Sequence, residues 1–393
     1  MSARRAAPQT SRDDDKSTGR WSVPLSDVLV DAEVERAAAE VVRSGWWSMG
    51  PRVAEFEQAF AGLLSARHAF AVANGTAALH LALLAIECGP GDEVVVPSLN
   101  FVAAANTITH TGATPVFCDV IGPDDLTADP RDIEAAVGPR TRAILVMHYG
   151  GHACRMDEIL ELAERRGLAV IEDAAHAPAG EFRGRACGTL GAVGCFSFFS
   201  NKNLPMGEGG MVVTDDDALA EKIRLFRSHG MTTLTWDRHR GHASSYDVVL
   251  RGFNYRLDEL RAALGLVELG RLREGNRARG EIVERYRRAL DGEAGISMPF
   301  VPREGVVSTH HLAVILLPEG KARHDVQTAL AERGIQTSVH YPPIHMFSAY
   351  KEQPRRSLPV TESIAERVLT LPLFPHMSDA QVAAVIEGVL ASV

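Results

Sequence analysis

The chain has 393 residues, of which 46% are hydrophobic and 23% are charged, as is typical of a globular protein with one large and one smaller domain. Its formal net charge of −9 argues against a nucleic-acid polymer as a partner, and no apolar run approaches the ~18 residues that a membrane-spanning helix needs. The five cysteines are widely spaced without a C-x-x-C pair, so we expect free thiols in the cytoplasm rather than disulfides.

The first twenty residues are polar and charged. Because they lack the apolar centre of a signal peptide, we expect 1–20 to form a disordered tail. From Val30 to Thr214, short apolar runs alternate with helical patterns. The sequence therefore predicts a large α/β domain over 21–275 and a small C-terminal α+β domain over 276–393.

The strand candidates of the large domain are rich in Val, Ile and Ala, with helical patterns such as Thr76–Ile86 and Met156–Arg166 between them. This alternation indicates a mostly parallel sheet that is covered by helices on both faces, the α/β class. The candidates are Ala69–Ala73, Glu93–Pro97, Pro115–Val120, Ala143–His148, Ala169–Glu172 and Val193–Phe199.

Apolar residues at helical spacing predict a long helical region over Leu257–Leu290 that connects the two domains. Four glycines within it weaken the expectation of one unbroken helix: Gly265, Gly270, Gly275 and Gly280. In the small domain we expect a strand at His311–Leu317 and helices at Asp325–Arg333 and Asp379–Leu390.

Polar groups follow four of the predicted strands. In parallel sheets, ligands bind beyond the carboxyl ends of the strands, so these groups are expected to form one site. Asn74-Gly75-Thr76 follows the first strand, Asn100-Phe101 the second, Asp173 to His176 the fifth, and Lys202 the sixth.

Lys202 stands between an apolar strand and the glycine-rich turn Gly207–Gly210. Lysine is seldom buried at a strand end, because its charge must be desolvated. A lysine held there has a lowered pKa and becomes a nucleophilic amine, which suits a Schiff base with a carbonyl cofactor such as pyridoxal phosphate (PLP). An exposed loop lysine beside a hairpin is the alternative.

Gly75 and Thr76 lie between a strand and a helix, where glycine permits close approach and the helix presents free N–H groups. This is a phosphate-binding arrangement, although a simple N-cap by Thr76 is the alternative. Ser197, five residues before Lys202, could bind the same phosphate.

Asp173 ends an apolar strand, and a carboxylate there needs a cation or several donors. A protonated pyridine nitrogen is such a cation, whereas an N-cap or a core salt bridge are the alternatives. His176 could hydrogen-bond the ring oxygen or pack in the core. Phe101 could stack on the ring or belong to the core.

His148, His152 and Cys154 have a spacing that invites a metal interpretation. The set has no clear fourth ligand, and Gly150 and Gly151 argue against a helical pair of histidines. We therefore expect no metal site.

Together these segments resemble the DegT-type sugar aminotransferases, a fold-type I, PLP-dependent family. The resemblance covers nearly the whole chain after Val23, in the order of the family's motifs. The matching segments are Ser44-Gly45-Trp46 with Gly50-Pro51 and Phe56-Glu57, Asn74 to Leu79, Glu172 to His176, Ser197 to Gly210, Gly252 to Leu260, His340-Tyr341-Pro342-Pro343, and Leu371 to Pro375.

The resemblance implies a role for each matching residue. Lys202 would hold PLP as a Schiff base, and Asp173 would pair with the pyridine nitrogen. The family also implies a homodimer with two shared active sites. The other implied cofactor contacts are Gly75, Thr76 and Ser197 at the phosphate, Asn254 at the phosphate across the dimer interface, Phe101 stacked on the ring, and His176 near the ring oxygen.

The resemblance also implies amino transfer, since a branch of this fold that performs dehydration has histidine in place of the lysine. The stretch from Gly230 to Val249 resembles forms that act at C4 of nucleotide-linked 4-keto sugars. We therefore expect a 4-keto-6-deoxy nucleotide sugar as acceptor and L-glutamate as donor, in amino sugar and natural product biosynthesis. A 3-keto nucleotide sugar, a keto-cyclitol, or a non-catalytic PLP-binding sensor are the alternatives.

Substrate contacts are hypotheses from position and charge. Trp47, Ser48 and Met49 precede a Gly-Pro turn, and His340 and Tyr341 approach from the small domain. Basic candidates for an anionic diphosphate are Arg238, His239 and Arg256.

Overall fold

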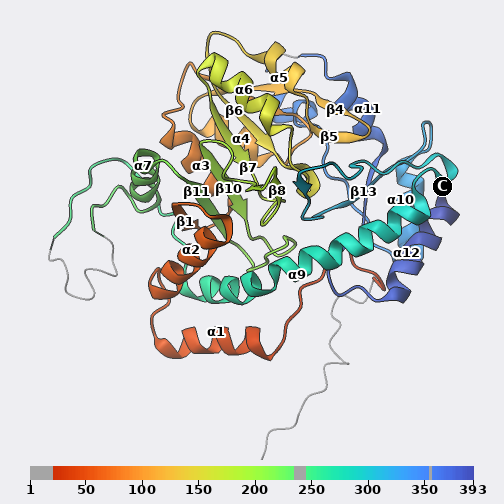
Figure 1. Ribbon diagram of the computed structural model, residues 1–393, viewed down its shortest axis with the longest axis horizontal. Coiled ribbons are helices and arrows are strands. Elements are labelled where there is room, and N and C mark those ends of the chain that lie inside the picture. The colour runs from red at the N-terminus through yellow and green to blue at the C-terminus, as the bar shows by residue number, and fades with distance from the viewer. Residues whose placement is uncertain (1–20, 234–244, 354–355) are drawn as a thin grey trace, which may run out of the picture.

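A seven-stranded sheet forms the centre of the computed structural model, which describes residues 21–233, 245–353 and 356–393 (Figure 1). β11 is antiparallel to both of its neighbours, and the other pairings in this sheet are parallel. The α/β prediction is therefore confirmed. Across the sheet the order is β1 (His68–Val72), β11 (Gly210–Thr214), β10 (Val193–Ser197), β7 (Ala169–Asp173), β6 (Thr141–Met147), β2 (Glu93–Pro97) and β3 (Thr114–Cys118).

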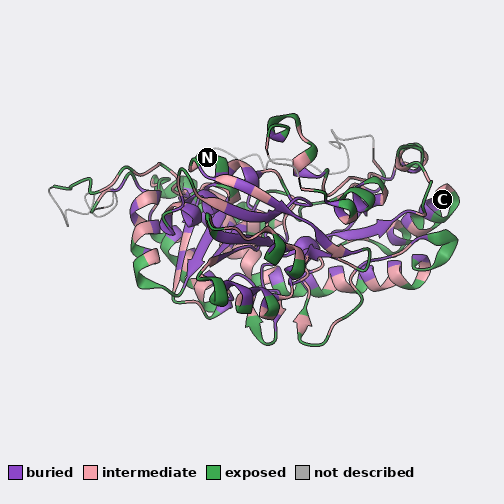
Figure 2. Ribbon diagram, turned by 90° about the horizontal axis from the view of Figure 1, so that it is seen from above, coloured by how far each residue is buried: buried purple, intermediate pink, exposed green. Residues whose placement is uncertain are grey.

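Both faces of this sheet are buried. Alternate residues of β6 belong to different apolar clusters: Ile144 and Val146 to one, Ala143 and Leu145 to the other. A strand buried on both faces needs a continuous apolar run, which explains why its sequence shows no polar alternation. Figure 2 shows the buried strands lying between helices whose outer faces are exposed.

Helices cover the two faces of the sheet in two groups. One face packs against α3 (Gly75–Ala85), α4 (Ala103–His110) and α7 (Asp217–Arg227). The other packs against α2 (Pro51–Leu64), α5 (Pro130–Ala136), α6 (Met156–Arg166) and the first half of α9 (Glu259–Leu290), and α1 (Ala32–Ser44) packs on α9.

α9 is one continuous helix of 32 residues, as the apolar spacing predicted, although its four glycines had weakened the expectation of an unbroken helix. Gly265 explains part of the difference. A Cβ at this position would lie 2.6 Å from Met206 Cε, so glycine lets the helix approach the lysine-bearing loop closely. The boundary expected at residues 275 and 276 falls inside α9, and the division into domains stays a prediction.

The second half of α9 packs into a separate apolar cluster with the C-terminal elements. The expected strand and both expected helices of this part are present, with bounds shifted by up to two residues. These elements are β13 (Ala313–Leu316), antiparallel to β14 (Val368–Leu371), and the helices α10 (Arg323–Glu332) and α12 (Asp379–Ser392).

In the described part of the chain, no helix has the length and apolar character needed to cross a membrane. Several short elements complete the fold. The short elements are β4 (Val120–Gly122), β5 (Asp125–Ala128), β8 (Glu181–Phe182), β9 (Arg185–Ala186), β12 (Val306–Val307) and α11 (Pro359–Arg367).

Candidate active site

A cavity of about 430 Å³ lies at the carboxyl ends of the parallel strands. The carboxyl ends of β1, β7 and β10 meet at this edge, because these strands run in the same direction. The structure thus brings together residues that are more than 260 positions apart. The expected residues that line the cavity are Gly75, Thr76, Phe101, Asp173, His176, Ser197, Lys202, His340 and Tyr341.

Lys202 is held by a tight loop after β10. The Lys202 N–H donates to the Phe199 carbonyl at 2.8 Å, and the fully buried Phe198 pairs its N–H with the Gly209 carbonyl at 2.8 Å. Burial lowers the pKa of Lys202 to about 8, against the opposing effect of the Asp173 carboxylate. At pH 7 about a tenth of this side chain is therefore the neutral, nucleophilic amine, far more than for a lysine of ordinary pKa.

Asp173 is the last residue of β7 and is only 5% exposed. Its Oδ1 accepts a hydrogen bond from the Ala175 N–H at 3.1 Å. Burial raises the pKa of the carboxyl, against the opposing effects of the Ala175 N–H and Lys202. A buried carboxylate with one backbone donor is short of positive charge, and a protonated pyridine nitrogen would supply it.

The first turn of α3 lies against the end of β10. Asn74 caps this helix by accepting from the Ala77 N–H at 2.8 Å, so the N–H groups of Gly75 and Thr76 are left at a positive helix end. A Cβ at Gly75 would lie 2.8 Å from Ser197 Cβ. The contact needs glycine, and it forms a cradle that suits a phosphate.

His176 has a defined tautomer in this cavity. Burial, and to a smaller extent the positive charge of Lys202, holds the pKa of His176 well below its usual value, so the ring is neutral. Its Nδ1 accepts from the Gly150 N–H at 3.3 Å, which leaves the proton on Nε2 to donate to the Tyr341 hydroxyl at 3.0 Å. Both nitrogens are thus engaged within the chain, and a bond to a cofactor oxygen would have to exchange with one of these partners.

Phe101, together with His340 and Tyr341 from the C-terminal part of the chain, also lines the cavity. Phe101 is 53% exposed, and its ring lies 5.8 Å from that of Tyr341. His340 Nδ1 lies 2.9 Å from Thr370 Oγ1, and the Tyr149 hydroxyl donates to the His340 carbonyl. Burial, and to a smaller extent the positive charge of Lys202, lowers the pKa of His340 to about 4, so this ring is neutral as well.

Several expected site residues lie away from the cavity or outside the described residues. Trp47 is 61% exposed, Asn254 is exposed beside Ser228, and Arg256 pairs with Val72 of β1. Arg238 and His239 lie outside the described residues. The expected residues that do not line this cavity in the described part of the single chain are Trp47, Ser48, Met49, Asn254 and Arg256.

Asn203, next to Lys202, has a positioning role that the sequence analysis missed. Its Nδ2 donates to Asn276 Oδ1 of α9 at 2.8 Å and to the Thr309 carbonyl at 2.9 Å, and its Oδ1 accepts from His311 Nδ1 at 2.8 Å. These bonds tie the lysine loop to α9 and to the segment before β13. Single asparagines and histidines give no periodic signal that could have revealed this network.

The histidines that invited a metal interpretation make other contacts. His148 and Glu172 are both fully buried, with 2.8 Å between Nε2 and Oε2. Glu172 also accepts from three backbone N–H groups, each at 2.7 Å. His152 lines a different cavity, where its ring stacks on Phe300 at 4.0 Å.

Comparisons with known proteins agree with this geometry. Spore coat polysaccharide biosynthesis protein SpsC of Bacillus subtilis (strain 168) is 44% identical over 375 residues, which are 93% of this chain and 96% of SpsC. The aminotransferase TlmJ from Streptoalloteichus hindustanus is 37% identical with a TM-score of 0.88, covering 94% of this chain and 98% of TlmJ. S. venezuelae DesV is 39% identical with a TM-score of 0.84, covering 92% and 94%.

The model of the DegT/DnrJ/EryC1/StrS aminotransferase family matches residues 29–390, nearly the full length of the chain. Enzymes of this family depend on PLP, and the buried Asp173, the lysine of lowered pKa and the phosphate cradle fit this cofactor. The chain belongs to the DegT/DnrJ/EryC1/StrS aminotransferase family and is a PLP-dependent enzyme of amino sugar biosynthesis.

Proposed function

We propose that this enzyme transfers the amino group of L-glutamate to the keto group of a nucleotide-linked 4-keto-6-deoxy sugar. The convergence of Lys202, Asp173 and the Gly75–Ser197 cradle in one cavity is the observation that carries the transamination. The sugar acceptor is supported by the 44% identity to SpsC, whose name places that protein in polysaccharide biosynthesis.

Lys202 is the proposed catalytic base and acid. It would hold PLP covalently, and its free amine would take up and later return the proton that leaves the donor α-carbon. A pKa of about 8 suits both directions of this transfer, because the amine can accept and release a proton near neutral pH.

Asp173, Gly75, Thr76 and Ser197 are proposed to bind and orient the cofactor. Bound PLP supplies an electron sink for the bond that breaks at the donor α-carbon. Asp173 would keep the ring nitrogen protonated, since its buried carboxylate gains from a neighbouring cation. The cradle would fix the phosphate, and the neutral rings of His340 and Tyr341 would limit access of water to the reacting atoms.

We further propose a homodimer with shared active sites. Asn254 and Arg256 lie away from the cavity of their own chain, which is the arrangement expected of residues that serve a partner's site. Trp47, with 61% of its surface exposed, is a candidate for the same interface. The five cysteines are buried and unpaired, which supports the proposal of a cytoplasmic enzyme.

The visible absorption spectrum of the PLP-loaded enzyme tests this function. Addition of L-glutamate should decrease the band of the bound cofactor and release 2-oxoglutarate, and subsequent addition of a 4-keto-6-deoxy nucleotide sugar should restore the band. A Lys202→Ala variant should show neither change. A 3-keto nucleotide sugar or a keto-cyclitol that restores the band when the 4-keto sugar does not would overturn the proposed acceptor, and a band insensitive to glutamate would overturn the proposed donor.

A further inference from the structure

Arg279 is a buried cation of α9. It is 6% exposed, and among the described residues its side chain makes no hydrogen bond or ion pair. Burial lowers the pKa of this guanidinium to about 10, and Glu268 compensates only in part. Removing a charge from water without pairing it is costly, so such a group points to a ligand that completes it.

Arg279 and Lys202 line the same cavity of about 390 Å³. This cavity lies between α9, the segment before α1 and the lysine loop, with Pro375 and His376 at its edge. Lys202 and Asn201 also line the cofactor cavity, so the two cavities adjoin at these residues. A ligand bound at Arg279 in this cavity would therefore lie near Lys202.

Three of the four acidic side chains that line this cavity lie beside a basic group, and the fourth, Glu274, is exposed. Asp31 pairs with Arg271 at 2.8 Å, and Asp27 lies 3.1 Å from His376. Glu268 lies 3.9 Å from Arg271, and burial raises the pKa of its carboxyl. Arg271 thus pairs with acidic side chains, whereas Arg279 has no ion pair with any of the described residues.

We propose that Arg279 binds a carboxylate of the amino donor while the donor's amino group reacts beside Lys202; this inference rests on the proposed amino-acid donor. A planar guanidinium holds a carboxylate through two parallel hydrogen bonds. A nucleotide diphosphate would bring more negative charge against Asp27, Asp31 and Glu268, so the carboxylate is the better match.

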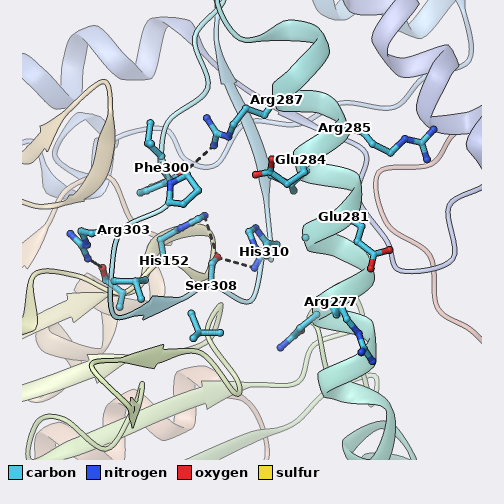
Figure 3. A pocket seen from close by; sticks show the side chains of 18 of the residues that line it. His152, Arg277, Glu281, Glu284, Arg285, Arg287, Phe300, Arg303, Ser308 and His310 are labelled. Atoms are coloured by element: carbon cyan, nitrogen blue, oxygen red, sulfur yellow. Dashed lines mark hydrogen bonds between the residues drawn. The ribbon is translucent and has the colours of Figure 1, made fainter.

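Arg277 provides a matched control on the same helix. It is exposed and, within the described part of the chain, has no ion pair. It lines a different cavity, of about 740 Å³, together with His152 and Phe300 (Figure 3). Loss of its charge removes the same chemical group from α9 without touching the space beside Lys202.

Binding of glutarate to the PLP-loaded enzyme, measured by calorimetry, tests this role without turnover. Glutarate carries the carboxylates of the donor but has no amino group to react. The Arg279→Met variant should bind glutarate at least about tenfold more weakly, the scale of a lost charge-assisted pair. It should also need a higher L-glutamate concentration to decrease the cofactor band, whereas Arg279→Lys should fall between and Arg277→Met should match wild type.

Thermal unfolding separates a ligand role from a structural one. An unpaired buried charge does not stabilise the fold, so Arg279→Met should keep or raise the Tm. A lowered Tm of Arg279→Met with unchanged glutarate binding would overturn the inference. Weaker binding of UDP, a nucleoside diphosphate, with unchanged binding of glutarate would also overturn it, because Arg279 would then serve the nucleotide. A wild-type band that L-glutamate does not change would instead overturn the proposed donor, and this inference with it.

Discussion

Lys202 and Asp173 perturb one another in opposite senses. Burial favours the neutral forms of both, whereas each charge favours the ionised form of the other. For Lys202 the effect of burial is the larger, since its pKa falls to about 8 despite the carboxylate. The site therefore holds a reactive amine beside a carboxyl group that gains from a second cation, and PLP offers both an aldehyde and a pyridinium.

The pH dependence of Lys202 reactivity follows from this balance. In enzyme freed of PLP, acetylation of Lys202 by trace acetic anhydride should rise with a midpoint near pH 8, because only the neutral amine reacts. Asp173 raises the pKa of Lys202, so the Asp173→Asn variant should shift the midpoint to lower pH. Mass spectrometry of the Lys202 peptide gives the profile, with the exposed Lys351 as internal reference. Identical profiles for the two lysines, or an upward shift in the variant, would contradict this balance.

The site residues that follow strands could be predicted from the sequence, because an apolar run identifies each strand and the next residues lie at its carboxyl end. Lys202, Asp173 and Gly75 are of this kind, and all line one cavity. Asn203 and Arg279 could not be predicted in this way. Their roles depend on partners or burial set by residues far along the chain, and nothing in their local sequence records this.

At the level of elements, the junction between α3 and β10 depends on the absence of a side chain at Gly75. Gly75→Ala would place a Cβ 2.8 Å from Ser197 Cβ and push the first turn of α3 away from the cradle. Overpacking of this kind costs about 1–3 kcal/mol, so PLP should bind about tenfold more weakly or worse. Titration of the PLP-free enzyme with PLP measures the change.

Gly270→Ala in α9 is the control for this substitution. A Cβ at Gly270 meets no atom within 4 Å, and replacing a glycine inside an exposed helix should stabilise the fold by up to about 1 kcal/mol. PLP affinity should stay at the wild-type value. Equal PLP affinity in the Gly75→Ala enzyme would show that the cradle tolerates the added methyl group.

Elements with a local signal were predicted closely, and those without one were not. β2 and α6 have the predicted bounds, because an apolar run and an amphipathic period define each of them. β10 ends two residues earlier than expected, at Ser197, where the chain turns into the lysine loop. The antiparallel pairing of β11 was not anticipated, since strand order depends on long-range contacts that a local pattern does not contain.

At the scale of the whole molecule, α9 joins two apolar cores and borders the loop that carries Lys202. Its first half packs on the sheet, its second half packs on the C-terminal cluster, and Asn276 between them bonds to Asn203. A shift of one core relative to the other would therefore act on the lysine loop through Asn203. The complete site also needs groups from outside this chain if Asn254 acts across a dimer interface.

Mixing two impaired variants tests whether the active site is shared between subunits. Lys202→Ala removes the proposed base, and Asn254→Ala removes the proposed phosphate contact. If Asn254 serves the partner's site, a dimer of one variant with the other contains one site with both residues intact. Co-refolded in equal amounts, the two variants should regain about one quarter of wild-type activity, because half of the dimers are mixed and each has one good site. If Asn254 acts within its own chain, every site of the mixed dimer lacks one of the two residues, and activity should not exceed the average of the two variants measured separately.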